Sequence, residues 1–317
     1  MQRYKKHFVI ILKLILLILI IRYLVIVLFN QNSIHDFQKL LKIINQNGLD
    51  YRFALIIVLF GMNHFLEAIK WKYATRKIQK ITWKNSFHAV FSGIAIGSIT
   101  PNHIGDYGGK ILKLEPNNRA KGVAVNFVIS SAQLLTTLFF GSLALFFVIE
   151  TYYPKLPNVT LFKYIFIPIF LLAAISLYFS IKHLSKIIHR IPVLKKISNY
   201  VDVLAYYKPS ELLLIFLLSC TKYLAFTFQY ILAVKYVKPE LSSFEIGASS
   251  ALIFLTQTIV PSFAFTELFV RGSIAAYFFS FISNDLLIIV LVTFSIWILN
   301  VIIPAIIGSV LILKSKF

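Results

Sequence analysis

Two short stretches of the sequence combine a proline, an acid and a base at nearly the same spacing. In each stretch the acid follows the proline by five or six residues, and the base follows the acid by four. These residues are Pro101, Asp106 and Lys110 in the first stretch and Pro261, Glu267 and Arg271 in the second. Side chains four residues apart share a helix face and can form an ion pair there. Each stretch is therefore predicted to present a charged pair just after a break in the helix.

The apolar sequence around these stretches indicates the class of protein. The chain has 317 residues, of which 58% are hydrophobic and 14% are charged. Runs such as 8–29 and 286–313 exceed the roughly 20 residues that a helix needs to cross a bilayer. We therefore expect an all-α polytopic membrane protein. The run 8–29 is too long for a signal peptide and no small-residue cleavage site follows it, so we expect an uncleaved first helix.

The basic residues predict the orientation in the membrane. The chain carries 32 Lys+Arg against 12 Asp+Glu, a net charge of +20. Because these bases cluster beside apolar runs, they indicate anchoring at an anionic cytoplasmic leaflet, and we expect no nucleic-acid partner. The basic segments, expected to be cytoplasmic, are the N-terminus, 70–84, 110–121, 182–208 and the C-terminus. The segments expected outside are 30–51, 151–160 and 283–285.

This charge distribution predicts that both breaks are re-entrant hairpins. The chain between the basic segments 70–84 and 110–121 has to return to the side that it left. Its first arm, 85–99, would extend only about 22 Å as a helix, less than the roughly 30 Å hydrocarbon core. We predict a hairpin over 85–114 that turns at Thr100–Pro101–Asn102, and a second over 244–282 that enters from outside. An ordinary loop remains an alternative, since Pro, Gly, Asn and Asp are common in loops.

Two hairpins that enter from opposite sides are typical of an inverted-topology repeat, in which broken helices build a substrate site near the midplane. We predict about six full spans plus these two hairpins in a single membrane domain, 1–317. The half-repeats are expected at about 52–149 and 211–313. The weakly amphipathic stretch 182–210 is expected to be a linker lying at the membrane interface.

Polar groups at the breaks are predicted to line a substrate cavity. Non-helical backbone inside a membrane is tolerated where it is buried in protein or lines a wet cavity. The free N–H groups at the start of the arm after each proline would suit an anionic group such as phosphate. Lys222 joins the set because charged residues within spans are costly and commonly functional. The predicted substrate-binding residues are Pro101, Gly105, Asp106, Lys110, Lys222, Pro261, Glu267 and Arg271.

Other polar residues in the apolar segments have a structural explanation. Lys13 and Arg22 lie in the first segment, where snorkelling to an interface accounts for them. Four further polar residues either line the cavity or form hydrogen bonds between helices, and we favour the second role. They are His64, Gln133, Gln229 and Gln257.

Metal, cofactor and soluble-type catalytic sites have no support in the sequence. The seven histidines are scattered and none forms a pair at ligand spacing. The single cysteine, Cys220, permits neither a disulfide framework nor a cysteine-based metal site. We recognise no Walker loop and no Ser-His-Asp elbow. We expect no cofactor and no bound metal.

The stretch LEAIKWKYATRKIQKITWKNSFHAVFSGIAIGSITPNHIGDYGGKILKL (66–114) resembles the flippase-like membrane protein family related to the transmembrane region of lysylphosphatidylglycerol synthase. A basic residue and Trp (Lys70–Trp71) end one helix, and a helix rich in small residues follows. That helix leads to the family's Thr/Leu-Pro-x-x-x-Gly-Glu/Asp motif. The motif residues here are Thr100, Pro101, Gly105 and Asp106. The second signature is matched only at Pro261 and Glu267, because 262–266 lacks the usual glycines.

The resemblance implies an integral membrane domain that translocates lipids, such as aminoacylated phosphatidylglycerol or other lipid-linked headgroups, in a bacterial inner membrane. The soluble aminoacyltransferase domain of full synthases is missing from this chain, so lysyl transfer by the chain is not expected. The leading hypothesis is a translocator of a phosphate-bearing headgroup. Lys110, Arg271 and Lys222 would be its charge partners, while Asp106 and Glu267 would orient those bases or contact a cationic headgroup.

Two alternatives remain open at this stage. The first is a membrane-embedded transferase acting on a lipid carrier, with Asp106 or Glu267 as the base; the lack of a nucleotide-binding motif counts against it. The second is an accessory subunit of envelope or glycan assembly. The expected partners are membrane lipids, namely an anionic phospholipid or a lipid-linked headgroup. A homo-oligomer or an envelope-synthesis partner is also left open.

Overall fold

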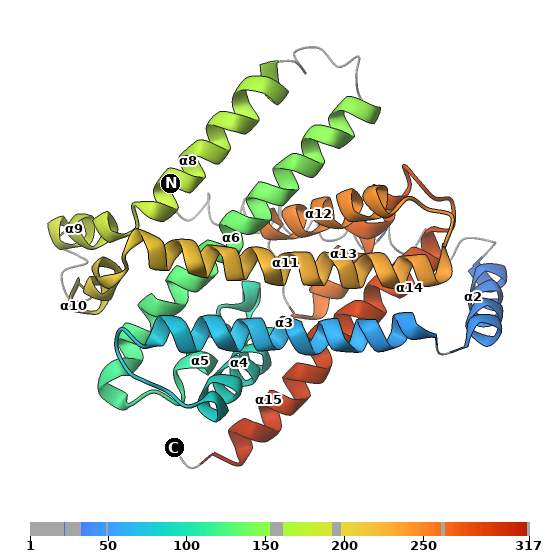
Figure 1. Cartoon of the computed structure of the whole chain (residues 1–317). Helices are drawn as coiled ribbons and strands as arrows, with labels where there is room; N and C mark the ends of the chain where they lie inside the picture. Colours follow the sequence, from blue (N-terminus) through green and yellow to red (C-terminus); the bar gives the residue numbers. More distant parts are fainter. Residues whose placement is uncertain are drawn as a thin grey trace, which may run out of the picture.

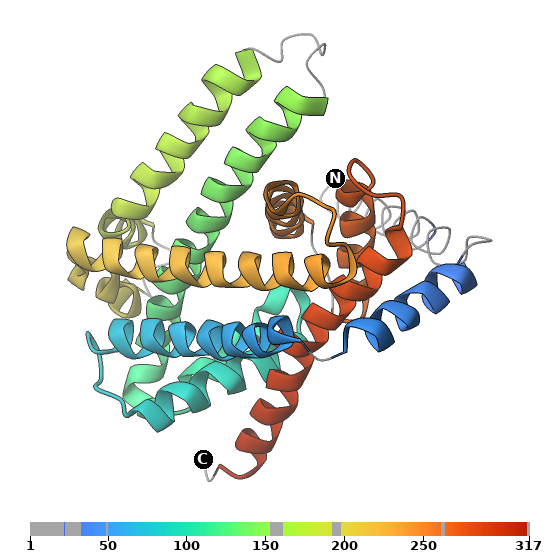
Figure 2. The same cartoon turned by 45° about the vertical axis from the view of Figure 1, so that its right-hand side comes forward.

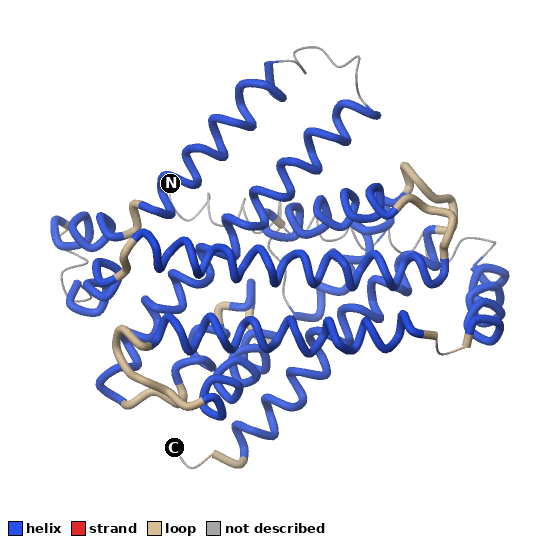
Figure 3. Tube along the Cα trace, in the orientation of Figure 1, coloured by secondary structure: helices blue, strands red, loops and turns tan. Residues whose placement is uncertain are grey.

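The computed structural model describes residues 22, 33–48, 50–152, 161–191, 198–260 and 264–315. This described part of the chain consists of helices and connecting loops, without a strand (Figure 3). Pro261, Lys13 and all of the expected first span except Arg22 lie outside the described residues.

Within the described ranges, five helical segments are long and apolar enough to cross a membrane. They are α3 (Tyr51–Thr75), α6 (Pro116–Tyr152), η2–α8 (Phe162–Phe179), α11 (Pro209–Val237) and α14–α15 (Leu286–Leu313). The last of them, α14–α15, coincides with the apolar run 286–313 that the sequence predicted as a span. The predicted class, an all-α polytopic membrane protein, is confirmed, and the number of full spans remains a prediction.

Two of the long helices change to π geometry shortly before a proline. η2 (Phe162–Phe166) leads into α8 (Ile167–Phe179), which contains Pro168. η5 (Ile298–Ile302) follows α14 (Leu286–Trp297) and leads into α15 (Ile303–Leu313), which contains Pro304. A proline inside a helix lacks an N–H and crowds the carbonyl four residues earlier, and a wider turn relieves that crowding.

Helices α3 and α11 lie side by side and antiparallel at the centre of the molecule (Figures 1 and 2). Near one end, the Tyr207 hydroxyl, just before α11, donates to the Ala74 carbonyl at 2.9 Å. Near the other end, Gln229 Nε2 donates to the Ile56 carbonyl at 3.0 Å. The pair therefore places side chains from the middle of both helices next to each other.

The first predicted hairpin consists of α4 (Trp83–Ser98), the turn η1 (Pro101–His103) and α5 (Gly105–Ile111). Its arms pack closely because glycines of α5 lie against the backbone of α4: a Cβ at Gly105 or Gly109 would overlap backbone atoms there. The hairpin returns to the end of α3. Ser86 Oγ donates to the Ala68 carbonyl at 2.6 Å, and the Glu115 N–H donates to Gln79 Oε1 at 3.0 Å.

The second hairpin consists of α12 (Ser243–Ile259) and α13 (Ala264–Phe279). Lys238, just before α12, forms an ion pair with Asp285, just after α13, so this hairpin also returns to the end where it started. Its second arm, α13, has 16 residues in the described part of the chain, fewer than the roughly 20 that a span needs. Whether either hairpin is re-entrant in a membrane remains a prediction.

Each hairpin packs against the last long helix of the opposite half of the chain. Gly308 of α15 lies against the backbone of Phe91 in α4. Gly141 of α6 lies against the side chain of Leu255 in α12. These reciprocal contacts connect the two predicted half-repeats, and the repeat itself and its boundaries remain a prediction.

Short helices complete the described chain at its periphery. α9 (Lys182–Arg190), α10 (Ser198–Val201) and η4 (Asp202–Tyr206) lie in the predicted linker 182–210 and form a small group near the start of α11 (Figure 1). α2 (Ser33–Asn47) lies near the opposite end of α11, where Lys39 contacts Asp285 at 3.1 Å.

Candidate functional site

A cavity of about 590 Å³ lies where the two hairpins meet the central helices. Its walls come from α3, α4, η1, α5, α6, α11, α12, α13 and η5. A volume of several hundred cubic ångströms is in the range of small-molecule binding sites. The charged side chains that line the cavity are Glu67, Lys70, His103, Asp106, Lys110, Lys222 and Arg271, with His103 charged only when protonated.

The Glu67 carboxylate of α3 is the centre of the charged groups in this cavity. Its Oε1 accepts from Lys110 Nζ of α5 at 2.8 Å. Its Oε2 lies 2.9 Å from Lys70 Nζ, one turn along α3, and accepts from Lys222 Nζ of α11 at 2.7 Å. Three ammonium groups from three different helices therefore converge on one carboxylate.

Lys110 connects this centre to the first hairpin. Its Nζ lies 2.9 Å from Asp106 Oδ2 and donates to Asn126 Oδ1 at 3.1 Å. Asn126, on α6, in turn donates from Nδ2 to Asp106 Oδ2 at 3.1 Å. The expected pairing of Asp106 with Lys110 is formed. Gly93 of α4 makes room for it, because a Cβ there would overlap the Asp106 carboxylate.

The three lysines differ in how much of their hydrogen-bonding capacity is used. An ammonium has three N–H donors. Lys70 is fully buried and uses its donors on Glu67, Gln133 and Ser219. Among the described residues, Lys222 has Glu67 as its one hydrogen-bond and ion-pair partner, and its side chain is 24% exposed. Lys222 is therefore the lysine with unused N–H donors that a ligand in the cavity could accept.

The cluster around Glu67 carries one positive charge in excess. Lys70, Lys110 and Lys222 contribute three positive charges, whereas Glu67 and Asp106 contribute two negative ones. Away from bulk water, charges interact over longer distances and with greater strength. An anion with a single charge would neutralise this cluster.

A second group of charges joins the two hairpins. Arg271 Nη2 donates to Glu267 Oε1 at 2.7 Å, which is the second acid–base pair that the sequence indicated. The other oxygen of Glu267 lies 3.2 Å from His103 Nε2, in the turn of the first hairpin. An adjoining cavity of about 460 Å³ is lined by Glu267. Asn102, His103 and Arg271 line both cavities, so they lie at the boundary between them.

The turn of the first hairpin is held by its own residues. Thr100 Oγ1 donates back toward the Ile96 and Gly97 carbonyls and accepts from the Gly105 N–H at 2.8 Å. Asn102 and His103 both have left-handed backbone, with φ of 49° and 55°. The sequence led us to expect a free N–H for an anion at the start of the second arm. At Gly105, however, that N–H is already used within the turn.

Several buried polar atoms without a hydrogen-bond partner lie on the walls of these two cavities. Buried polar atoms are nearly always paired, so a group of exceptions suggests that water or a ligand completes them. The unpaired wall atoms are His64 Nε2, Tyr223 Oη, Asn300 Oδ1, Gln257 Nε2 and Arg271 Nε.

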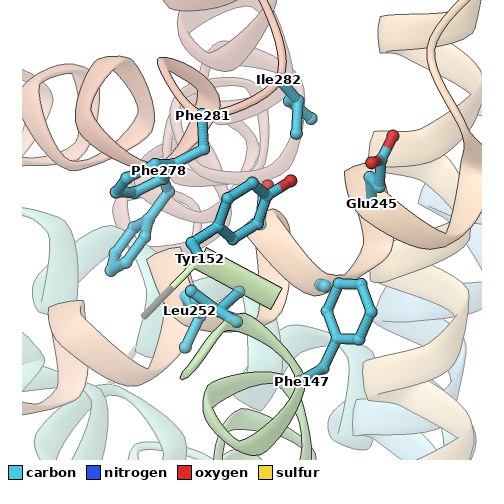
Figure 4. A pocket seen from close by; sticks show the side chains of 10 residues that line it. Phe147, Tyr152, Glu245, Leu252, Phe278, Phe281 and Ile282 are labelled. Atoms are coloured by element: carbon cyan, nitrogen blue, oxygen red, sulfur yellow. The ribbon is translucent and has the colours of Figure 1, made fainter. Parts of the chain in front are cut away.

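A third pocket lies between the end of α6 and the start of α12 (Figure 4). Tyr152 lies inside it among aromatic side chains, with Glu245 at one side. Its volume of about 10 Å³ leaves room for about one water molecule. This third pocket is therefore too small for a headgroup, unlike the two cavities of several hundred cubic ångströms beside the hairpins.

The comparison with protein families agrees with this architecture. A family model described as the lysylphosphatidylglycerol synthase TM region matches residues 10–311. The chain belongs to this family. As a member of the lysylphosphatidylglycerol synthase TM region family, it is a membrane protein of a lipid-related family. The searches of curated proteins and of solved structures returned no match.

The structure gathers most of the predicted site residues of this family member around the two cavities. Asp106, Lys110 and Lys222 line the larger cavity, Glu267 lines the smaller one, and Arg271 lines both. Pro101 and Gly105 lie in the turn and are not among the lining residues. Pro261 lies outside the described residues.

The four polar residues for which the sequence left two roles open do not all have the same role in the structure. His64 and Gln133 line the larger cavity, and Gln257 lines the smaller one. Gln229 is buried and accepts from Asn300 Nδ2 at 2.9 Å, which is a hydrogen bond between helices. Gln133 also accepts from Lys70, so lining the cavity and bonding between helices are combined in one side chain.

Sequence reasoning missed Glu67, Lys70, His103 and Asn126 as site residues. Both Glu67 and Lys70 lie in the stretch that carries the family resemblance, where the pattern indicates only that Lys70 is near the end of a helix. The rule that singled out Lys222, a charge inside an apolar segment, would also have selected Glu67. Among the described residues, no group of three or more His, Cys, Asp or Glu side chains is placed to hold a metal ion.

Proposed function

We propose that this protein translocates a lipid with a phosphate-bearing headgroup across the membrane, and that the headgroup enters the cavity around Glu67. The two hairpins would bring broken helices together around the headgroup, as in transporters built from inverted repeats. The acyl chains would remain in the lipid phase while the polar headgroup moves through the protein.

The single observation that carries the proposal is the excess of positive charge in a cavity between the hairpins. A buried cluster with three lysines and two carboxylates favours an anion over a neutral or cationic group. Lys222 has unused N–H donors facing that space. Charge-assisted hydrogen bonds from lysine suit a phosphate oxygen.

The test is a lipid translocation assay with the purified full chain in proteoliposomes. The probe is phosphatidylglycerol carrying a fluorophore on an acyl chain, and the measurement is the rate at which the probe becomes accessible to a membrane-impermeant quencher. We expect the protein to accelerate this rate. Replacing Lys222→Ala should reduce the rate at least tenfold, because a hydrogen bond to a charged group contributes roughly 1.5–3 kcal/mol.

Lys163 provides a matched control. It is a buried lysine of η2 that forms an ion pair with Glu150 of α6, and it does not line either cavity. Lys163→Ala should leave translocation close to the rate of the unmodified protein. Equal rates for the Lys222→Ala variant and the unmodified protein would reject the site. A chain that does not accelerate translocation at all would reject the function.

A further inference from the structure

The three ammonium groups around Glu67 are arranged as in an anion-binding site, and the Glu67 carboxylate occupies that site. Lys70, Lys110 and Lys222 come from α3, α5 and α11 and reach the two oxygens of one carboxylate at 2.7–2.9 Å. A phosphate oxygen pair would accept charge-assisted hydrogen bonds at similar distances. The carboxylate of Glu67 therefore stands where an anionic ligand would make its strongest contacts.

Two of the three lysines are fixed independently of Glu67. Lys70 also donates to Gln133 and Ser219, and Lys110 also contacts Asn126 and Asp106. If Glu67 turned away, each of them would keep two partners and gain one free donor. Lys222 would have all its donors available, because Glu67 is its one hydrogen-bond and ion-pair partner among the described residues. Lys70 and Lys110 would then stay in place without the Glu67 carboxylate, and Lys222 would be free to bind a ligand.

The charges of the cluster also allow a phosphate group to replace the Glu67 carboxylate at the lysines. A phosphodiester carries one negative charge, equal to that of Glu67. Its entry would bring the cluster, which has one positive charge in excess, to neutrality while Glu67 stays in the cavity wall. Without Glu67, the three lysines would have only the Asp106 carboxylate beside them and would repel one another at low dielectric. Glu67 removes that repulsion while no ligand is bound.

We propose that Glu67 is an internal occupant of the anion site, and that the phosphate group of the ligand displaces it from Lys222 and takes over the lysine contacts. The proposal rests on the proposed function only for the lipid source of the phosphate. Glu67 then limits affinity by competing with the ligand. The same competition favours release of the ligand, because Glu67 can take back the lysine contacts. A transported group must bind weakly enough to leave.

The experiment compares binding by the unmodified full chain and by Glu67→Gln, both purified into nanodiscs of phosphatidylcholine. One probe is short-chain phosphatidylglycerol and the other is inorganic phosphate, each titrated by calorimetry. Removing the competing charge should raise the affinity at least tenfold for one or both probes. Adding Lys222→Gln to Glu67→Gln should reverse most of that gain.

Glu150→Gln is the matched control, because Glu150 also pairs with a buried lysine but lies away from the cavity. It should leave both affinities unchanged. A gain for the lipid alone identifies a headgroup site, a gain for phosphate alone identifies a site for free anions, and a gain for both shows that the phosphate group itself is recognised. Each of these three results supports the occupant role.

Unchanged or weaker binding of both probes by a folded Glu67→Gln variant would overturn the proposal. If that variant does not fold, Glu67→Asp retains the charge and shortens the side chain by one methylene. It should raise affinity in the same direction, and an unchanged affinity would overturn the proposal equally. A binding gain without any lipid translocation would reject the proposed function and leave the occupant role standing.

Discussion

His103 Nε2 lies 3.2 Å from Glu267 Oε2, and this contact joins the turn of the first hairpin to the first turns of α13 in the second. The backbone at His103 and at its neighbour Asn102 is left-handed. For a residue other than glycine, such a conformation costs of order 1–3 kcal/mol and is retained where the surroundings impose it. Asn102 and His103 line both cavities and Glu267 lines the smaller one, so the contact lies at the boundary between the cavities.

Holding this contact closed should stop translocation, because a headgroup passing from one cavity to the other has to move the wall. The change is His103→Cys together with Glu267→Cys in a Cys220→Ser background, followed by a short cleavable cross-linker. We expect the cross-linked protein to lose most of its translocation rate in the proteoliposome assay and to regain it after cleavage. Each single variant treated in the same way is the control. A cross-linked protein that translocates at the full rate would show that the hairpins need not separate.

Replacing Gly109→Ala should destabilise the first hairpin, since the added Cβ would overlap the backbone of Ser92 and Gly93. Overpacking of this kind costs typically about 1–3 kcal/mol. We expect a lower thermal unfolding midpoint in detergent. Its neighbour Gly108 is a matched control, because a Cβ there meets no atom within 4 Å. Gly108→Ala should leave the midpoint unchanged or raise it slightly, as alanine favours a helix over glycine. An equal decrease of the unfolding midpoint in both variants would contradict the close packing of α4 and α5.

The attachment of α9 to η4 should depend on pH through Asp202. Hydrogen bonds from Ser185 Oγ at 2.6 Å and His189 Nε2 at 2.8 Å lower the pKa of Asp202 below its ordinary value of 3.8. These bonds favour the charged carboxylate. Their stabilising contribution is thus complete above about pH 4 and is lost as the pH falls through the lower value of the folded state.

Hydrogen exchange of the α9 amides, corrected for the intrinsic effect of pH on exchange, measures this dependence. Protection in the unmodified protein should decrease below about pH 4, where Asp202 begins to take up a proton. Asp202→Asn should show reduced protection already at pH 7 and little further change. The same pH profile in both proteins would argue against a role for the carboxylate.

The long helices and the first turn were predictable because they depend on local sequence. Apolar runs predicted an all-α membrane protein, and the run 286–313 coincides with the helical segment Leu286–Leu313. The turn found at Pro101–His103 overlaps the one predicted at Thr100–Pro101–Asn102. Acid–base pairs four residues apart could also be predicted from the sequence, since their geometry is set by a single helix. Asp106–Lys110 and Glu267–Arg271 are both formed.

The convergence on Glu67 could not be derived in this way. It requires α3, α5 and α11 to pack so that Glu67, Lys110 and Lys222 come to the same point. This depends on packing between segments more than 40 residues apart in sequence. The contact of His103 with Glu267 spans the two hairpins and depends on the same long-range packing. A single sequence specifies which helices form far more directly than which of their side chains come together.

The reciprocal packing of Gly308 against Phe91 and of Gly141 against Leu255 has a consequence for the chain as a whole. Each hairpin lacks one wall until the other half of the protein supplies it. A fragment that ends before α11 would leave α4 without α15, and the complementary fragment would leave α12 without α6. The two halves therefore complete each other's packing, since α4 gains this wall only with α15 in place and α12 only with α6 in place.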